Sequence, residues 1–265
     1  MKKNLFIVVC SFNVEPKLII KRLDKIFNRY DYHYKGVIVC NKNFYVTTDS
    51  SNWNIIEGSN EFFDFSAYFE GLVFLNNNHL VDSNILFLND SIFLKHDFKY
   101  SINLILKANF VISEIITPSL IGFRSHYTTI CLFNPWSKID VFIPTYIFII
   151  NNAALNLFIS LKSNAEIENI FTDNINDWSD NIPYQFKVFL NSYIFNNNFN
   201  NSWDGNKKYI LNKKDLYKKA RCVYFEHKLS GEIGLHGNFI FPNVGKKSQI
   251  IFSFRNYFHK LFNLI

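Results

Sequence analysis

Two aspartates fall where a folded sheet would present them to a ligand. Asp90 follows the apolar run in "ILFLNDSIF" (85–93), and Asp64 begins a helical pattern in "NEFFDFSAYFEGL" (60–72). Because the carboxyl ends of parallel strands meet at one edge of a sheet, both carboxylates are expected there. One could contact ribose hydroxyls and the other a diphosphate or its divalent cation. The alternative is an aspartate that only caps the next helix.

The surrounding pattern predicts the sheet that would hold these aspartates. Strands are expected in "NLFIVVCSF" (4–12) and "GVIVCN" (36–41), with a helix between them that starts near Pro16. Further strands are expected in 44–49, 85–90 and 109–115, and a helix in the segment 54–75. This alternation predicts an α/β fold with a mainly parallel sheet covered by helices on both faces.

Beyond residue 120 the pattern changes. The segment 122–134 is expected to be a strand, 145–163 a strand then a helix or one long helix, and the Asn-rich stretch 191–208 a loop.

Composition and charge narrow the function classes. The 265 residues are 48% hydrophobic and 18% aromatic, which excludes a disordered chain. The net charge of +6 is concentrated in residues 205–265, where 12 Lys or Arg face 3 acids. This end of the chain favours an anionic partner: nucleic acid, an anionic membrane surface or a phosphorylated substrate.

The cysteine spacing and the apolar segments indicate a cytosolic protein. Cys10, Cys40, Cys131 and Cys222 lack the close spacing of zinc or redox pairs, so free thiols in a reducing compartment are expected. The apolar run after the first lysines suits a strand better than a signal peptide, and no segment is apolar enough to cross a bilayer. The last residues, 246–265, predict a basic amphipathic helix that lies on a membrane or packs on the protein body.

The two acidic segments together resemble a known family. "FFDFSAYFEGL" and "ILFLNDSIF" are similar to segments of bacterial polysaccharide glycosyltransferases with a GT-A-like (Rossmann-like) fold, of the rhamnan synthesis protein F type. The resemblance covers about residues 1 to 135. It implies that Asp90, with Asn89 and Ser91, holds the diphosphate and a Mg²⁺ or Mn²⁺ ion. It also implies that Asp64 lies near the nucleotide sugar.

The resemblance assigns further roles to other polar residues. Ser11 and Asn13 would form the base pocket at the end of the first strand. Basic side chains could replace the metal ion, and the candidates are Arg124, Lys213, Lys214 and Arg221, of which Arg221 is preferred.

Sugar transfer with inversion also needs a base. In "RCVYFEHKLSGEIGLHG" (221–237), Glu226 and His227 follow an apolar strand candidate, and three glycines suggest a turning loop over a ligand. Glu226 is the predicted base for the acceptor hydroxyl, with His227 and His236 behind it. A surface or salt-bridged glutamate is the alternative. Ser125 and His126 are candidates for acceptor contact.

These observations predict an enzyme that transfers a sugar from a nucleotide-diphosphate donor to a bacterial surface glycan such as O-antigen, capsule or lipooligosaccharide. The acceptor is expected to be lipid-linked, at the inner face of the cytoplasmic membrane, without a nucleic-acid partner. Residues 1–243 would form one domain, with a nucleotide-sugar half (1–135) and an acceptor half (136–243), followed by the basic tail 244–265. Two alternatives stay open: a non-catalytic scaffold in glycan assembly, and a nucleic-acid-binding protein that uses the basic C-terminal region.

Overall fold

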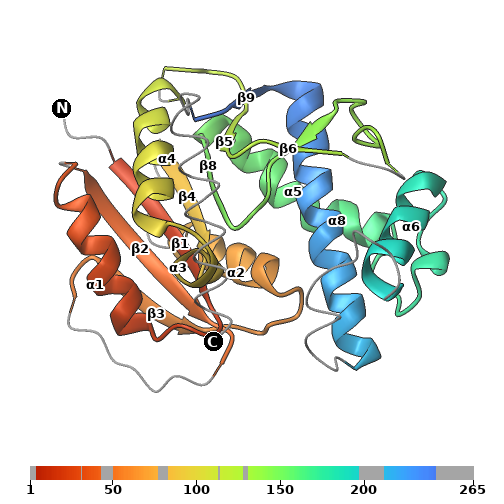
Figure 1. The fold of residues 1–265 in the computed structure, drawn as a ribbon, viewed down its shortest axis with the longest axis horizontal. Coiled ribbons are helices and arrows are strands. Elements are labelled where there is room, and N and C mark those ends of the chain that lie inside the picture. The colour runs from red at the N-terminus through yellow and green to blue at the C-terminus, as the bar shows by residue number, and fades with distance from the viewer. Residues whose placement is uncertain are drawn as a thin grey trace.

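A seven-stranded sheet organises the chain. The computed structural model describes residues 4–30, 32–42, 50–76, 83–112, 114–127, 131–196 and 212–242. The strand order is β3-β2-β1-β4-β8-β5-β9 (Figure 1). The bounds are β1 Asn4–Ser11, β2 His33–Cys40, β3 Trp53–Glu57, β4 Asn84–Asn89, β5 Ser119–Gly122, β8 Ile147–Ile150 and β9 Asn238–Ile240.

All neighbouring strands in this sheet run parallel except at β8, which is antiparallel to both β4 and β5. The predicted α/β fold with a mainly parallel sheet is therefore confirmed. Strands from both predicted halves share the sheet, because β8 lies between β4 and β5.

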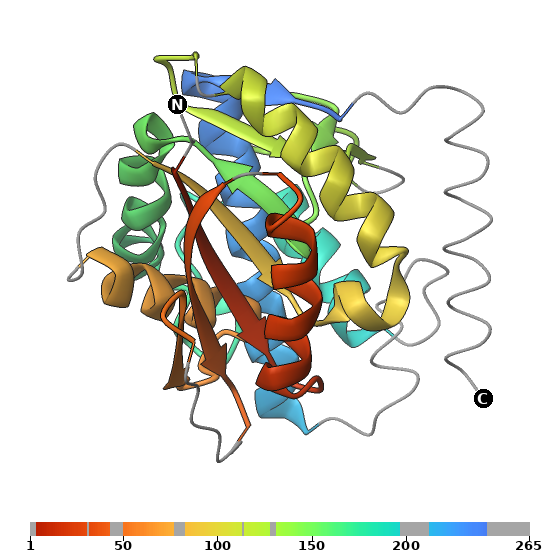
Figure 2. The same cartoon turned by 90° about the vertical axis from the view of Figure 1, so that its left-hand side faces the viewer.

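Helices cover both faces of the sheet. Among the described residues, the helices with six or more residues are α1 Pro16–Phe27, α2 Asp64–Asn76, α4 Phe98–Ile112, α5 Leu155–Ile167, α6 Tyr184–Leu190 and α8 Lys213–His236. In Figure 2 the red α1 and the yellow α4 lie on one side of the sheet, and the orange α2 and the green α5 lie on the other. Alternate strand residues enter two separate hydrophobic cores, as expected for a sheet buried on both faces.

Local sequence explains the two helices nearest the predicted site. Pro16 occupies the first position of α1, where its missing N–H has no cost, and Ile19, Leu23 and Ile26 form the buried stripe. In α2, a Cβ added at Gly71 would lie 2.4 Å from Val8 Cγ1 of β1. The absence of a side chain at Gly71 therefore lets α2 approach β1 closely.

Two predicted strands are helical in the structure, one in α8 and one at the end of α4. Residues 221–237 are not a strand and a loop: all but the last lie in α8. Their glycines permit close packing, since a Cβ at Gly231 would lie 2.8 Å from Asn134 Oδ1 and one at Gly234 would lie 2.8 Å from Ser137 Oγ. The segment 109–115 is not a strand, because α4 continues to Ile112.

The remaining elements are short. They are α3 Ser91–Lys95, β6 Ser125–His126, β7 Val141–Phe142, η1 Asn152–Ala154, η2 Ile175–Asp177 and the π-helical turn η3 Asn191–Phe195. The segment 122–134 therefore contains only the end of β5 and the two-residue β6 within its described part, rather than one strand. The segment 145–163 contains β8 and then helix, the first of the two predicted arrangements.

Some sequence predictions lie outside the described residues. These are the strand 44–49, the amphipathic tail 244–265, and most of the Asn-rich stretch 191–208, whose first residues form η3. Within the described ranges, none of the helices combines the length and the apolar character needed to span a membrane.

Candidate functional site at the carboxyl edge of the sheet

The strands β1, β2 and β4 end at one edge of the sheet, which we call the carboxyl edge. The antiparallel strand β8 begins at the same edge. The connection after β1 passes through α1 on one face, whereas α2, which leads into β4, packs on the other face. The β1–β4 boundary is therefore a topological switch point, the position where open α/β sheets bind ligands.

Asp90 holds the loop that follows β1. Its Oδ2 accepts hydrogen bonds from the backbone N–H groups of Phe12 (2.8 Å), Val14 (2.9 Å) and Asn13. Asp90 is buried, and Ser11 supports the same loop by donating from Oγ to Val14 O at 2.6 Å. The Oδ2 atom of Asp90 therefore fixes the backbone of the β1–α1 loop. A metal contact at Asp90 remains a prediction.

Asn89 and Ser91 orient Asp64. Asn89 Nδ2 donates to Asp64 Oδ2 at 2.7 Å. The Oδ1 of Asn89 accepts from the backbone N–H of Ser91 at 3.1 Å and from the Ser91 hydroxyl. The amide of Asn89 is thus fixed on both sides. The Asn-Asp-Ser triplet at the end of β4 positions two other parts of the edge, Asp64 and the β1–α1 loop.

Asp64 is a partly buried carboxyl group at the first position of α2. Burial raises its pKa, while the positive charge of Lys219 and the Asn89 hydrogen bond lower it. The Cys10 thiol donates to Asp64 Oδ1 at 3.8 Å. The residue before it, Phe63, has a positive φ of 51°, which is uncommon for a bulky side chain and is often found at functional sites.

Glu226 reaches the same edge from α8. Its Oε2 accepts from both the backbone N–H and the Oγ1 hydroxyl of Thr145, each at 2.8 Å. Thr145 immediately precedes Tyr146 and β8. Burial raises the pKa of Glu226, with Lys219 and the Thr145 bonds acting in the opposite direction. A partly buried carboxylate with a raised pKa suits a general base near neutral pH.

Lys219 and Cys222 lie on the same side of α8 as Glu226. The spacing of three and seven residues places the three side chains on one stripe of a helix. Burial alone would lower the pKa of Lys219, but its electrostatic interactions with Cys222, Asp64, Tyr193 and Glu226 outweigh burial and raise the pKa. Lys219 therefore interacts electrostatically with both Asp64 and Glu226.

His227 points away from this edge. Successive residues on a helix differ by about 100° in direction, so Glu226 and His227 cannot serve one site from α8. The ring of His227 is buried against Phe142, Phe186 and Phe189. The structure does not bring His227 to the predicted catalytic position.

A hydrogen-bond chain fixes the protonation of His227. Asn134 Nδ2 donates to the Tyr127 hydroxyl oxygen at 2.9 Å, and that oxygen lies 2.7 Å from His227 Nδ1. In the tautomer that carries its hydrogen on Nε2, neutral His227 accepts the Tyr127 proton at Nδ1. Burial lowers the pKa of His227 to about 3.

We expect this buried histidine to destabilise the fold in acid. Between about pH 6.5 and the folded pKa of about 3, the unfolded chain binds one more proton than the folded chain. As pH falls through that window, His227 therefore lowers the free energy of unfolding by up to about 1.4 kcal/mol per pH unit. Urea unfolding of the wild type and of His227→Phe between pH 4 and 7 measures the difference. Equal pH slopes would contradict a neutral buried His227.

Several other predicted residues have structural partners away from Asp64 and Glu226. Arg221 donates to the carbonyl oxygens of Ile170 (2.9 Å), Phe171 (2.6 Å) and Thr172 (3.0 Å), so its guanidinium group holds the loop after α5. Arg124 is exposed, 3.9 Å from Asp140.

The other predicted contacts are surface residues. His126 lies 3.7 Å from the same Asp140, and Ser125 pairs with Phe142 in the small β6–β7 ladder. His236 is exposed at the end of α8, 3.7 Å from Glu232. Lys213 and Lys214 are exposed in the first turn of α8. Asn13 is exposed in the β1–α1 loop, which leaves its side chain accessible at the switch point.

Only some carboxylate oxygens at the carboxyl edge are committed to hydrogen bonds: Asp90 accepts through Oδ2 and Glu226 through Oε2, which leaves Asp90 Oδ1 and Glu226 Oε1 for a ligand. The Asp90 Oδ2 atom already accepts three backbone hydrogen bonds, and both oxygens of Asp64 accept from side chains. The ammonium group of Lys219 would repel an ion placed between Asp64 and Glu226. Across the described ranges, no group of three or more His, Cys, Asp or Glu side chains could hold a metal.

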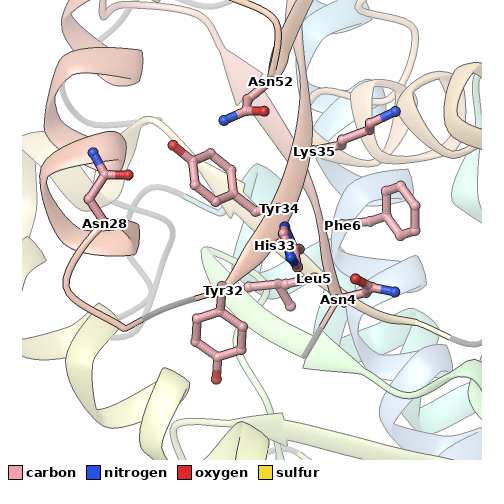
Figure 3. Close-up of a pocket in the computed structure, with 9 residues that line it drawn as sticks. All are labelled: Asn4, Leu5, Phe6, Asn28, Tyr32, His33, Tyr34, Lys35 and Asn52. Atoms are coloured by element: carbon pink, nitrogen blue, oxygen red, sulfur yellow. The ribbon is translucent and has the colours of Figure 1, made fainter. Parts of the chain in front are cut away.

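A separate cavity of about 430 Å³ lies at the opposite end of β1 and β2. Figure 3 shows Tyr34, Asn28 and Asn52 on one side of these strands, and Phe6 and Lys35 on the other. The cavity belongs to the amino ends of the strands, far from the ends that carry Ser11 and Asn89. The described residues that line it include no carboxylate.

The sequence analysis missed Lys219, Thr145 and the role of Asn89 as the orienting group for Asp64. The spacing of Lys219, Cys222 and Glu226 could have revealed the first, had the segment been interpreted as a helix. Comparison with known proteins gives no further assignment: no family model matches this chain, and a search of curated proteins returned no significant match.

Proposed function

We propose that this protein is a glycosyltransferase that moves a sugar from a nucleoside diphosphate to a hydroxyl group of a glycan. The observation that carries the proposal is the convergence of Asp64 and Glu226, with Lys219, on the carboxyl edge beside the β1–β4 switch point. The carboxylates can contact hydroxyl groups, and the ammonium group can contact phosphate. A sugar nucleotide contains both kinds of group.

The chemistry requires a base and a leaving group that is stabilised as it departs. The acceptor oxygen attacks the anomeric carbon of the donor sugar and forms the new C–O bond. The bond from that carbon to the phosphate oxygen breaks, and the nucleoside diphosphate leaves with the electron pair. Glu226 takes the acceptor proton, for which its raised pKa is suited.

Asp64 is the proposed binding group for the hydroxyls of the donor. Its carboxyl group is oriented by Asn89, which Ser91 fixes in turn. Such support from neighbouring side chains limits the rotation of Asp64 and reduces the entropy lost on binding. The β1–α1 loop, held by Asp90, presents exposed Asn13 at the same switch point, where it can contact the base or ribose.

The acceptor and the location in the cell follow from the resemblance and from charge. We propose a lipid-linked bacterial surface glycan as acceptor, such as a precursor of O-antigen, capsule or lipooligosaccharide. The excess of Lys and Arg in residues 205–265 supports contact with an anionic membrane surface. The protein would then work on the cytoplasmic side of the membrane as a peripheral enzyme.

A thermal-shift screen tests the proposed function. The purified protein is heated with UDP, GDP, CDP or dTDP, each with EDTA, Mg²⁺ or Mn²⁺. A ligand that binds only the folded state stabilises it by about 2.7 kcal/mol at a hundredfold excess over its Kd, so one nucleotide should raise Tm selectively. The sugar nucleotides of the diphosphate that binds are then tested in the same way. Asp64→Asn should retain the Asn89 hydrogen bond but lose most of the Tm shift that the intact sugar nucleotide produces.

If none of the four nucleotides raises Tm under any of the three conditions, the proposal is wrong. A scaffold or a nucleic-acid-binding protein would then be favoured.

A further inference from the structure

Helix α1 exposes a row of basic side chains, which we call the α1 basic face. Its members, all exposed, are Lys17, Lys21, Arg22, Lys25 and Arg29. They recur at spacings of three, four and seven residues, which places them on one side of α1 and of the turn after it. The opposite side of the helix carries the buried stripe of Ile19, Leu23 and Ile26. Positive charge therefore runs along the whole outer side of α1.

Contacts on the two flanks of α1 show that this face points outward. Asp24 is the only acid within α1, and its Oδ1 accepts hydrogen bonds from the Tyr34 hydroxyl (2.9 Å) and from Trp53 Nε1 (2.7 Å) of the sheet. On the other flank, the Arg22 guanidinium lies over the ring of Phe93 in α3, 5.7 Å from its centroid. The three lysines lie on the arc of α1 between these two flanks, where they are exposed.

The α1 basic face lacks the acidic partners that basic residues have elsewhere in this protein. Lys228 of α8 lies 3.0 Å from Glu168 and 3.3 Å from Glu232. Lys218 lies 4.0 Å from Asp215. Within the described ranges, by contrast, no ion pair involves a member of the α1 basic face. Like charges along one side of a helix repel one another, so an anionic partner would stabilise this face.

Exposed apolar side chains accompany this charge. Leu18 of α1 is 40% exposed, and Phe110 and Val111 near the end of α4 are 45% and 56% exposed. Helices α1 and α4 lie on the same side of the sheet (Figure 2), and the Tyr30 hydroxyl after α1 donates to Asn103 Oδ1 of α4 at 2.9 Å. Basic and apolar side chains together suit the interface of an anionic membrane, where buried apolar area and attraction to anionic lipids both strengthen binding.

We propose that the α1 basic face, with Leu18 and Phe110, binds the headgroups of anionic phospholipids. The Lys and Arg side chains contact the lipid phosphates, and the apolar side chains enter the boundary between headgroups and acyl chains. Because α1 begins directly after the loop that Asp90 holds, the membrane would lie beside the carboxyl edge, where a lipid-linked acceptor is needed.

This inference deepens the membrane contact of the proposed function and rests on it for the location of the protein, but it requires no sugar transfer. It assigns the contact to α1 and α4, in addition to the basic residues of 205–265. A nucleic acid would also supply phosphates, but the exposed apolar side chains favour the membrane.

Sedimentation of the full chain with lipid vesicles tests the proposal. One set of vesicles contains equal parts of phosphatidylglycerol and phosphatidylcholine, and the other contains phosphatidylcholine alone. The protein should sediment with the anionic vesicles, and high salt should weaken this binding because it screens exposed charges. Equal binding to both sets of vesicles, or binding to neither, would overturn the proposal.

A matched pair of double variants locates the contact. Lys21→Gln with Lys25→Gln removes two charges from the α1 basic face, and glutamine preserves the helix. Lys35→Gln with Lys162→Gln removes two charges from the opposite side of the sheet, where Lys35 extends beside Phe6 (Figure 3) and Lys162 is exposed on α5. At about fivefold for each basic residue, the first variant should weaken binding to anionic vesicles by about 25-fold, and the second by about twofold or less.

Equal effects of the two double variants, including no effect of either, would overturn the proposal, because another surface or the net charge would then determine binding. Fluorescence anisotropy with a labelled single-stranded oligonucleotide tests the other anionic partner. Oligonucleotide binding that the first variant abolishes, without binding of the wild type to anionic vesicles, would replace the membrane with nucleic acid. Vesicle binding is measured without a nucleotide, so its failure and the failure of the thermal-shift screen are distinguishable.

Discussion

Glu226→Gln is expected to reduce kcat for sugar transfer by about 10²-fold to 10⁴-fold, the usual contribution of a general base. Glutamine keeps an oxygen that can accept from Thr145, so the fold and donor binding should be retained. The amide cannot take the acceptor proton. Steady-state kinetics would give kcat and KM separately. The donors are sugar nucleotides of the diphosphate that the thermal-shift screen identifies, and the acceptor is a purified glycolipid.

Glu232→Gln is the matched control for this substitution. Glu232 lies on the same helix but pairs with Lys228 at 3.3 Å and with His236 at 3.7 Å, away from the carboxyl edge. Its change should leave kcat within about twofold of the wild-type value, because Glu232 contacts neither Asp64 nor Thr145 and Lys228 keeps Glu168 as its partner. If Glu226→Gln retained kcat to the same extent as this control, Glu226 could not be the base.

Asp90→Ala is expected to lower the free energy of unfolding by about 2–4 kcal/mol, because three backbone N–H groups would lose their acceptor. These groups belong to Phe12, Asn13 and Val14, and the side chain of Asp90 is buried. Urea unfolding at neutral pH measures the change. Asp90→Asn should recover part of the loss, since its amide oxygen can still accept.

Asp140→Ala provides the comparison for a surface aspartate. Asp140 is exposed and lies 3.9 Å from Arg124, so its removal should change the free energy of unfolding by about 0.5 kcal/mol or less. If Asp90→Ala were no more destabilising than Asp140→Ala, the β1–α1 loop could not depend on Asp90 in the way its hydrogen bonds indicate.

Local sequence predicted β1, α1, β2, α2 and β4 and the edge where their polar residues meet, but it missed β3, which lies in the segment expected to be helix, and the extent of α4. The continuous apolar runs of β1 and β4 and the apolar stripe of α1 indicate their type, because these strands are buried on both faces and the helix on one. The polar residues that follow β4 could be placed at the carboxyl edge for the same reason. The role of each of these residues could not be predicted, because it depends on which backbone and side-chain groups come within hydrogen-bond distance.

The second half was harder to predict because its pairing is non-local. Nothing within β8 reveals that it inserts antiparallel between β4 and β5, since a short run of buried apolar residues fits either direction. The glycines of α8 suggested a loop by local propensity, but packing against Asn134 and Ser137 overrides that propensity. This error also hid Lys219, whose relation to Glu226 depends on a helix.

The most direct test of the proposed site is a crystal structure of the protein with the nucleoside diphosphate that binds most tightly. The diphosphate should lie at the carboxyl ends of β1 and β4, with a phosphate oxygen within about 3 Å of Lys219 Nζ. A diphosphate in the cavity at the amino ends of β1 and β2, beside Tyr34 and Lys35, would contradict the assignment of the site (Figure 3).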